Sequence, residues 1–312
     1  MTNRALLQFI KAKGAGDSTI RRLADLAALG GVSPADVVAM QPQKIAAVLD
    51  TRKEVAESIL AAKEPAARLG DELDAQGVQL LWLNDSQYPE RLRAVLGMDA
   101  PPVLFVKGNQ DLLAQPAVSF CGSRKASRDG LEVTERAARI LANEGVCVVS
   151  GYAHGVDMAA HRGVLAAGGT TILVLAEGIL CFQVKKDIED LLAEGNHLIV
   201  SQFPPRLPWI GRNAMKRNGT IIGLSDAMIL VESGRDGGTF AAGSEALKRH
   251  HPLFVVDFAH PGPSAEANPH FLERGGIPLR GDRERVPNLQ KVLEVTRHPN
   301  WRVRRTNGLL FS

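Results

Sequence analysis

Three short segments combine glycine with hydroxyl-bearing or basic side chains, a composition typical of loops that hold phosphate. They span residues 121–127, 150–157 and 232–239. Glycine lets the main chain approach a ligand closely because it has no Cβ, and free amides at a helix N-terminus attract an anion. The candidate contacts are Gly122, Ser123, Arg124 and Ser127 in the first segment, Ser150, Gly151, His154 and Gly155 in the second, and Gly237, Gly238 and Thr239 in the third.

A fourth segment begins at Arg212, places three cations within six residues, and adds Lys216, Arg217 and Asn218 to the candidate set. If these side chains and the glycine segments share one rim, they would meet an oligoanion or a nucleotide. The alternative is a scattered, solvated surface, and we favour that interpretation for Lys185 and Arg235. None of the glycine segments has the G-x-G-x-x-G spacing of dinucleotide-binding proteins.

The elements that must position these segments alternate between apolar runs and helical patterns. Short, β-branched runs predict buried strands, and they occupy 117–120, 146–149, 171–175, 197–200, 227–231 and 253–256. Helical patterns lie between them, including one at 185–193. This alternation predicts an α/β protein with a mostly parallel sheet. The glycine segments follow strand ends, so they should meet at the carboxyl edge of the sheet, where such folds bind ligands.

The chain divides by pattern into three parts. Residues 1–76 read as a small helical domain of the helix-hairpin-helix or SAM-like kind, with a glycine turn at 14–16 that could hold a DNA phosphate on backbone amides. A helical bundle used for packing or docking is the alternative, and we weight it somewhat higher. Residues 77–296 form the sheet domain, where strands at 78–82 and 103–108 should pair and extend the sheet. Residues 297–312 form a basic tail, and one helix is expected after 268, at 288–295.

Bulk properties place the protein among ordinary globular chains. It has 312 residues, 45% of them hydrophobic, and a formal net charge of +3, which permits a polyanion partner without arguing for one. Its three cysteines, Cys121, Cys147 and Cys181, lack metal-ligand spacing, so no metal site is expected. No apolar run reaches the ~20 residues that span a bilayer, and the N-terminus has no signal-peptide pattern. We therefore expect a cytoplasmic protein that does not enter a membrane.

An ordered set of short motifs resembles the DNA-processing protein A family, DprA, also called Smf. The resemblance covers residues from about 80 to 293. Its pieces are Tyr88-Pro89 with Leu92, the run 102–108, Gly122-Ser123-Arg124 with Ser127 and Gly130, the runs 150–157, 160–163 and 203–205, Arg217-Asn218 ahead of 222–227, Val231-Glu232, and Gly237-Gly238-Thr239.

This resemblance implies an extended Rossmann-like domain that binds single-stranded DNA and loads a RecA-type recombinase during DNA uptake. It implies a homodimer, no cofactor and no enzymatic activity. Carried over to this chain, the pocket comprises Gly122, Ser123, Arg124, Ser150, Gly151 and His154, with Lys216, Arg217 and Asn218 as further phosphate contacts. Bases would need stacking surfaces, for which Tyr152, Phe203 and Trp209 are the candidates.

Several positions depart from the family pattern and keep a second hypothesis open. Gly219 stands where an arginine is usual, Gln202 where a glutamate is usual, and Asp257 where a proline is usual; the third loop also differs. Related folds include nucleotide-binding sensors and nucleoside-monophosphate N-glycosidases, whose catalytic acid could here be Glu232. That carboxylate could equally orient loop amides or pair with Arg124.

A docking protein without a ligand is the third and least favoured interpretation. His154 could contact phosphate, carry a proton or serve as a plain loop residue. His161 is expected to pack or cap rather than react.

Overall fold

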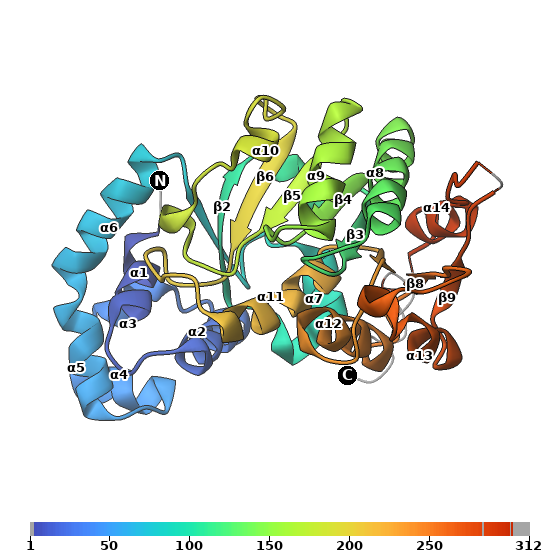
Figure 1. The fold of residues 1–312 in the computed structure, drawn as a ribbon. Helices are drawn as coiled ribbons and strands as arrows, with labels where there is room; N and C mark the ends of the chain where they lie inside the picture. Colours follow the sequence, from blue (N-terminus) through green and yellow to red (C-terminus); the bar gives the residue numbers. More distant parts are fainter. Residues whose placement is uncertain (1–2, 283, 300, 302–312) are drawn as a thin grey trace.

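A single nine-stranded sheet forms the centre of the protein, with the strand order β1-β2-β6-β5-β4-β3-β7-β8-β9 (Figure 1). The computed structural model describes residues 3–282, 284–299 and 301. The strands are β1 (Gln79–Trp82), β2 (Val103–Gly108), β3 (Ala117–Cys121), β4 (Cys147–Ser150), β5 (Thr171–Val174), β6 (His197–Ser201), β7 (Ala227–Leu230), β8 (Leu253–Val256) and β9 (Ile277–Leu279). The predicted α/β, Rossmann-like class is confirmed.

The chain reverses its direction of travel across the sheet between β3 and β7. From β3, the strands β4, β5 and β6 follow one another toward one edge of the sheet. Strands β7, β8 and β9 follow one another toward the other edge, starting next to β3, and all of these pairs are parallel. The loops after β3 and β7 therefore part at a topological switch point, the place where open α/β sheets leave a crevice. At the far edge, β1 pairs with β2 and β2 with β6 in antiparallel fashion, which confirms the predicted extension of the sheet.

Helices cover both faces because successive residues of each buried strand point to opposite sides. Val118 and Phe120 of β3 pack with α8 (Arg128–Asn143), α9 (Val156–Ala166) and α14 (Gln290–Arg297), whereas Ala117 and Cys121 belong to the opposite face. That face packs against α7 (Glu90–Leu96), α11 (Gly211–Gly223), α12 (Gly237–Lys248) and α13 (Asn268–Glu273). Both layers are apolar, so the sheet is a rigid support for its edge loops.

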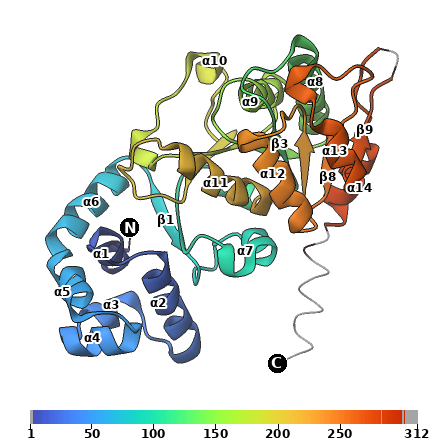
Figure 2. The ribbon, with the colours of Figure 1, turned by 60° about the horizontal axis from the view of Figure 1, so that its bottom comes forward.

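Six helices precede the sheet and gather at its β1 edge (Figures 1 and 2). They are α1 (Arg4–Lys11), α2 (Asp17–Gly30), α3 (Pro34–Val38), α4 (Pro42–Leu49), α5 (Lys53–Ala61) and α6 (Lys63–Ala75). Arg21 of α2 donates to the Ala100 carbonyl at 2.6 Å, and Asn84 donates to the Ala24 carbonyl at 2.9 Å. The helices end at Ala75 as the pattern predicts, while their independence as a domain stays a prediction.

Two elements differ from the sequence expectations. The helix expected at 185–193 is limited to α10 (Lys186–Glu189). The Asn196 side chain accepts from the Ala193 amide and donates to the Leu191 carbonyl, so it satisfies the backbone in a turn instead of a helix. After residue 268 the chain forms α13 and β9 ahead of the single expected helix. Buried Asn268 anchors α13 by donating to the carbonyls of Val231 and Val256.

The remaining findings concern the tail and the membrane. Most of the predicted basic tail, residues 302–312, lies outside the described residues; Arg297 ends α14 and pairs with Glu144 at 3.5 Å. Among the described residues, no helix combines the length and the apolar character that crossing a bilayer requires.

Candidate functional site

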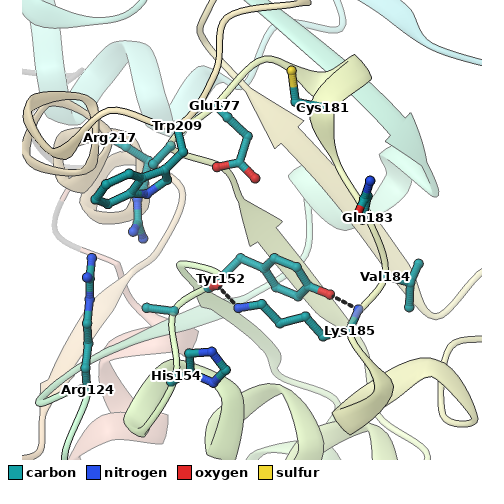
Figure 3. Close-up of a pocket in the computed structure, with 12 residues that line it drawn as sticks. Arg124, Tyr152, His154, Glu177, Cys181, Gln183, Val184, Lys185, Trp209 and Arg217 are labelled. Carbon is teal, nitrogen blue, oxygen red and sulfur yellow. Dashed lines mark hydrogen bonds between the residues drawn. The ribbon is translucent and has the colours of Figure 1, made fainter.

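The loops at the carboxyl ends of β3, β4, β5 and β7 line two adjoining cavities. The Tyr152 cavity, of about 440 Å³, lies over β4 and β5, and its lining includes Tyr152, His154, Glu177 and Lys185 (Figure 3). The Thr239 cavity, of about 450 Å³, lies at the switch point, and its lining includes Gly122, Ser123, Asn218, Gly238 and Thr239. Arg124, Ala153, Trp209 and Arg217 line both cavities. The predicted meeting of the glycine loops at one edge is thus found.

The first loop is held in place by the buried carboxylate of Glu232. Glu232 is 2% exposed, and it accepts hydrogen bonds from the amide of Ser127, at 2.9 Å, and from the Ser127 hydroxyl. Ser127 is also the N-cap of α8, where its hydroxyl accepts from the Gly130 amide at 3.0 Å. Glu232 therefore orients a loop amide, one of the roles weighed for it, and it lines neither cavity.

The second loop depends on glycine at two positions for steric reasons. A Cβ on Gly151 would lie 1.8 Å from a terminal nitrogen of Arg217 and 2.4 Å from an Asp157 carboxylate oxygen. Gly155 has a φ of +77°, and a Cβ there would lie 2.3 Å from the Ser123 carbonyl oxygen. Neither position tolerates a side chain without moving backbone or a buried ion, so the two loops pack together as one unit.

A buried arginine ties this unit to α11. Arg217 is 6% exposed, and its guanidinium faces the Asp157 carboxylate at 4.0 Å. Burial lowers the pKa of Arg217, an effect that the Asp157 charge opposes. The Arg217 Nε is buried without a hydrogen-bond partner among the described residues. An unsatisfied buried donor is costly, and the same side chain lines both cavities.

His161 supports the second loop from below rather than facing a ligand. It is fully buried, with Nε2 2.6 Å from the Gly151 carbonyl oxygen and Nδ1 2.7 Å from the Thr171 hydroxyl. Burial lowers the pKa of His161, which favours the neutral ring. These surroundings agree with the packing role expected for His161.

Lys185 belongs to the site, and the sequence interpretation of it as a solvated surface residue is wrong. Its ammonium donates to the Tyr152 carbonyl and lies 4.3 Å from the centroid of the Tyr152 ring. Its backbone amide donates to the Tyr152 hydroxyl at 2.6 Å (Figure 3). Burial lowers the pKa of Lys185. Its place just before the short α10 gave no recognisable motif. By contrast, Arg235 is 81% exposed and pairs only with Glu266 among the described residues.

The three aromatic candidates differ in what they offer a base. Trp209 is 54% exposed, and the Arg124 guanidinium lies over its ring at 5.7 Å. Tyr152 is half-buried and lines one cavity, with Phe182 packed beside it. Phe203 is 4% exposed and counts among the buried hydrophobic residues, so it cannot stack on a ligand.

The cations of α11 separate because the helix turns neighbouring side chains about 100° apart. Arg217 points to the buried side, whereas Lys216 pairs with Asp17 of α2 at 2.6 Å and lines neither cavity. Asn218 donates to the Gly238 carbonyl at 3.2 Å and so joins α11 to the third loop. That loop leads into the N-terminus of α12.

Eight of the fourteen predicted contacts line a cavity. They are Gly122, Ser123, Arg124, His154, Arg217, Asn218, Gly238 and Thr239. The other six, Ser127, Ser150, Gly151, Gly155, Lys216 and Gly237, shape the surrounding structure. Ser150, for example, is buried and donates to the Phe120 carbonyl at 2.8 Å. Sequence reasoning missed Lys185 and Glu177, both of which line the Tyr152 cavity.

The sequence is similar to a family of known proteins. The family model described as DNA recombination-mediator protein A matches residues 79–281. DNA processing protein DprA of Streptococcus pneumoniae is 33% identical over 193 residues, which cover 61% of this chain and 67% of that protein. Protein Smf of Escherichia coli is 32% identical over 207 residues, which cover 65% of this chain and 54% of that protein. These matches span from about half to two thirds of the relatives' length.

Two solved structures share the fold. The X-ray structure of DNA processing protein A from S. pneumoniae matches with a TM-score of 0.74 at 26% identity, covering 89% of this chain and 95% of that one. A structure of the Helicobacter pylori protein, described by its single-stranded DNA binding mode, matches with a TM-score of 0.57 at 26% identity, covering 69% and 94%. Because the family match takes in more than half of the chain, the protein belongs to the DNA recombination-mediator protein A (DprA/Smf) family.

Proposed function

We propose that this protein binds single-stranded DNA at the carboxyl edge of its sheet and acts in DNA processing and recombination. The observation that carries the proposal is the wall shared by the two cavities, where Arg124 lies over the exposed ring of Trp209. A cation stacked on an aromatic ring offers a backbone contact and a base platform at one point, the combination that single-strand binders use.

The two cavities adjoin each other, so a chain of nucleotides can cross from one to the other. Phosphate would meet Arg124, the buried guanidinium of Arg217 and the amides of the first and second loops. Bases would meet Trp209 and Tyr152. Membership of the family and the single-stranded DNA binding described for the H. pylori structure support the same ligand.

The proposal includes the protein partners that the family resemblance implies. These are a RecA-type recombinase and a second copy of this chain. Sedimentation of the full chain at several concentrations, with and without a recombinase, tests both; a monomer that does not shift with the recombinase would remove them.

We propose a binding role without catalysis. The rival hypothesis of nucleoside-monophosphate hydrolysis relied on Glu232 as the acid, and Glu232 is buried under the first loop with two hydrogen bonds from Ser127. A carboxylate so engaged cannot reach a ribose. Chromatography of nucleoside monophosphates after incubation with the protein should show no free base. Release of a base would support the hydrolysis hypothesis instead.

A binding screen tests the function directly. Fluorescence anisotropy is measured for a labelled oligothymidylate, with unlabelled oligonucleotides, mononucleotides and cyclic nucleotides as competitors, at low and at physiological salt. We expect oligonucleotides to compete strongly, mononucleotides weakly, and affinity to fall as salt rises. Competition by a mononucleotide as strong as that by the oligomer would instead favour a closed nucleotide pocket.

A further inference from the structure

The Tyr152 cavity contains a carboxylate that phosphate binding does not explain. Glu177 follows β5 and lines the cavity between Trp209 and Tyr152, with its oxygens directed toward the space between the two rings (Figure 3). An anion there repels a phosphate group. The part of the cavity next to Glu177 must therefore accept something other than the DNA backbone.

The Glu177 carboxylate has its hydrogen-bonding capacity free. Within the described residues it makes no hydrogen bond and no ion pair, and only its backbone carbonyl is engaged, by the Ser201 hydroxyl at 2.6 Å. Lys185, a cation on the same cavity wall, donates instead to the Tyr152 carbonyl. A half-buried carboxylate without hydrogen-bond donors loses solvation, and the charges of Lys185 and Arg217 offset that loss only in part, because the pKa of Glu177 stays raised. A ligand that brings donors is therefore favoured at this point.

The flanking rings indicate what kind of donor this is. A base stacked on Trp209 or placed along the Tyr152 ring would present its edge to the floor of the cavity, where Glu177 lies. Proteins that recognise single strands read such edges by hydrogen bonds while aromatic groups hold the face. Glu177 is thus placed to read a base edge.

Among the four bases, only guanine presents two adjacent donors on its Watson–Crick edge, at N1 and at the 2-amino group. Adenine and cytosine each present one donor beside an acceptor. Thymine presents N3–H between two carbonyl oxygens, which a carboxylate repels. A carboxylate accepts two parallel bonds from a pair of neighbouring donors, the strong bidentate arrangement.

Resting on the proposed binding of single-stranded DNA, we infer that Glu177 makes the Tyr152 cavity a base-reading subsite that selects guanine over thymine. Arg124 and Arg217 hold the adjacent phosphates, and Glu177 sets which base enters between the rings. The protein then binds any single strand, but the register that places a guanine in the Tyr152 cavity has the highest affinity.

The experiment compares oligothymidylates that carry one central guanine, hypoxanthine, cytosine or adenine with the all-thymine strand, by competition anisotropy. We expect the guanine strand to bind about tenfold more tightly than the all-thymine strand, within the range for a bidentate base contact. Hypoxanthine keeps N1–H but lacks the 2-amino group, so it should lose most of that gain. This comparison uses the unaltered protein and does not depend on the folding of a variant.

Glu177→Gln should lose the preference for guanine over thymine, because a carboxamide carries one acceptor and one donor group and cannot accept two bonds from guanine. The variant can pair instead with the donor and acceptor of adenine. Glu189→Gln, on exposed α10, is the matched control and should keep the guanine preference. Equal binding of the guanine and all-thymine strands, or a preference that survives in Glu177→Gln, would overturn the inference while single-strand binding stands. Failure of every strand to bind would instead remove the proposed function and this inference with it.

Discussion

The guanidinium of Arg124 lies over the indole ring of Trp209, with 5.7 Å between the guanidinium carbon and the ring centroid. The two residues come from distant parts of the chain, the loop after β3 and the segment before α11, and they meet in the wall between the cavities. A cation over an indole face contributes about 0.5–1 kcal/mol at an exposed site. The contact pre-positions Arg124 for phosphate without consuming its donors.

Replacing Arg124 by alanine should weaken binding of single-stranded DNA by about 1–2 kcal/mol and reduce the salt slope by about 0.7, the value for one phosphate contact on a single strand. Anisotropy titrations over a series of salt concentrations measure both quantities. Arg235→Ala is the matched control, since Arg235 is exposed at the same edge and lines neither cavity. An unchanged affinity and slope in Arg124→Ala would remove this residue from the site.

Replacing Trp209 by alanine should cost about 1–3 kcal/mol of binding free energy, the usual value of one stacked base, whereas Trp209→Phe should retain most of the affinity. Because Trp209 is 54% exposed, neither change should lower the free energy of unfolding appreciably. The measurements are anisotropy and urea denaturation. Equal affinities for the alanine and phenylalanine variants would argue against stacking on this ring.

Gly155→Ala should destabilise the fold by about 3 kcal/mol, because an alanine there combines a backbone conformation open mainly to glycine with a collision against the Ser123 carbonyl. Gly168→Ala is the matched control: its φ is +75° but no atom lies within 4 Å of the added Cβ, so only about 1 kcal/mol is expected. Urea unfolding of the two variants measures the difference. Similar losses in both would show that the contact with the first loop is unimportant.

Arg217→Met should lower the free energy of unfolding by about 3 kcal/mol, because it leaves the buried Asp157 carboxylate without its counter-charge. Adding Asp157→Asn should restore part of the loss, as expected for residues that act as a pair. Single-strand binding should remain weak in the double variant, since the guanidinium is still missing. Full recovery of binding would place Arg217 outside the interface.

The guanine preference should depend on pH. Burial raises the pKa of Glu177, while Lys185 and Arg217 lower it; Arg124, Tyr152 and His154 also line the cavity. Only the ionised carboxylate accepts two bonds from guanine, so the preference is present above the pKa of Glu177 and is lost as the pH falls through it. That pKa is above the ordinary 4.5, so the loss should begin on the acid side of neutrality.

The ratio of affinities for the guanine and all-thymine strands, measured between about pH 7 and pH 5, tests this expectation. Glu177→Gln should give a ratio that does not change with pH. A ratio that falls equally in both proteins would show that Glu177 is not the group responsible.

The sequence predicted the sheet and the edge that carries the site because the buried strands are short, apolar and followed by glycine. It also placed Gly122 and Arg124 at that edge. It could not predict which of Lys216 and Arg217 faces the cavities, since that depends on the rotation of α11, a helix that its pattern did not reveal. Lys216 reaches Asp17 from another part of the chain, a contact that no local pattern contains.

Other errors have the same origin in long-range packing. Phe203 was a stacking candidate by residue type, yet it is buried. Lys185 was assigned to the solvated surface, yet the carbonyl of Tyr152, 33 positions earlier in the sequence, draws its ammonium into the cavity. In each case the position of the side chain depends on partners that are distant in the sequence. A single sequence does not show those partners.

The absence of a side chain at Gly151 has an evolutionary consequence. The space that a Cβ would fill is taken by the guanidinium of Arg217, so a chain with any other residue at position 151 cannot keep arginine at 217 in this arrangement. The two positions must therefore change together among descendants of a common ancestor. Their joint inheritance would identify which relatives build the same crevice, even where the rest of the sequence has diverged.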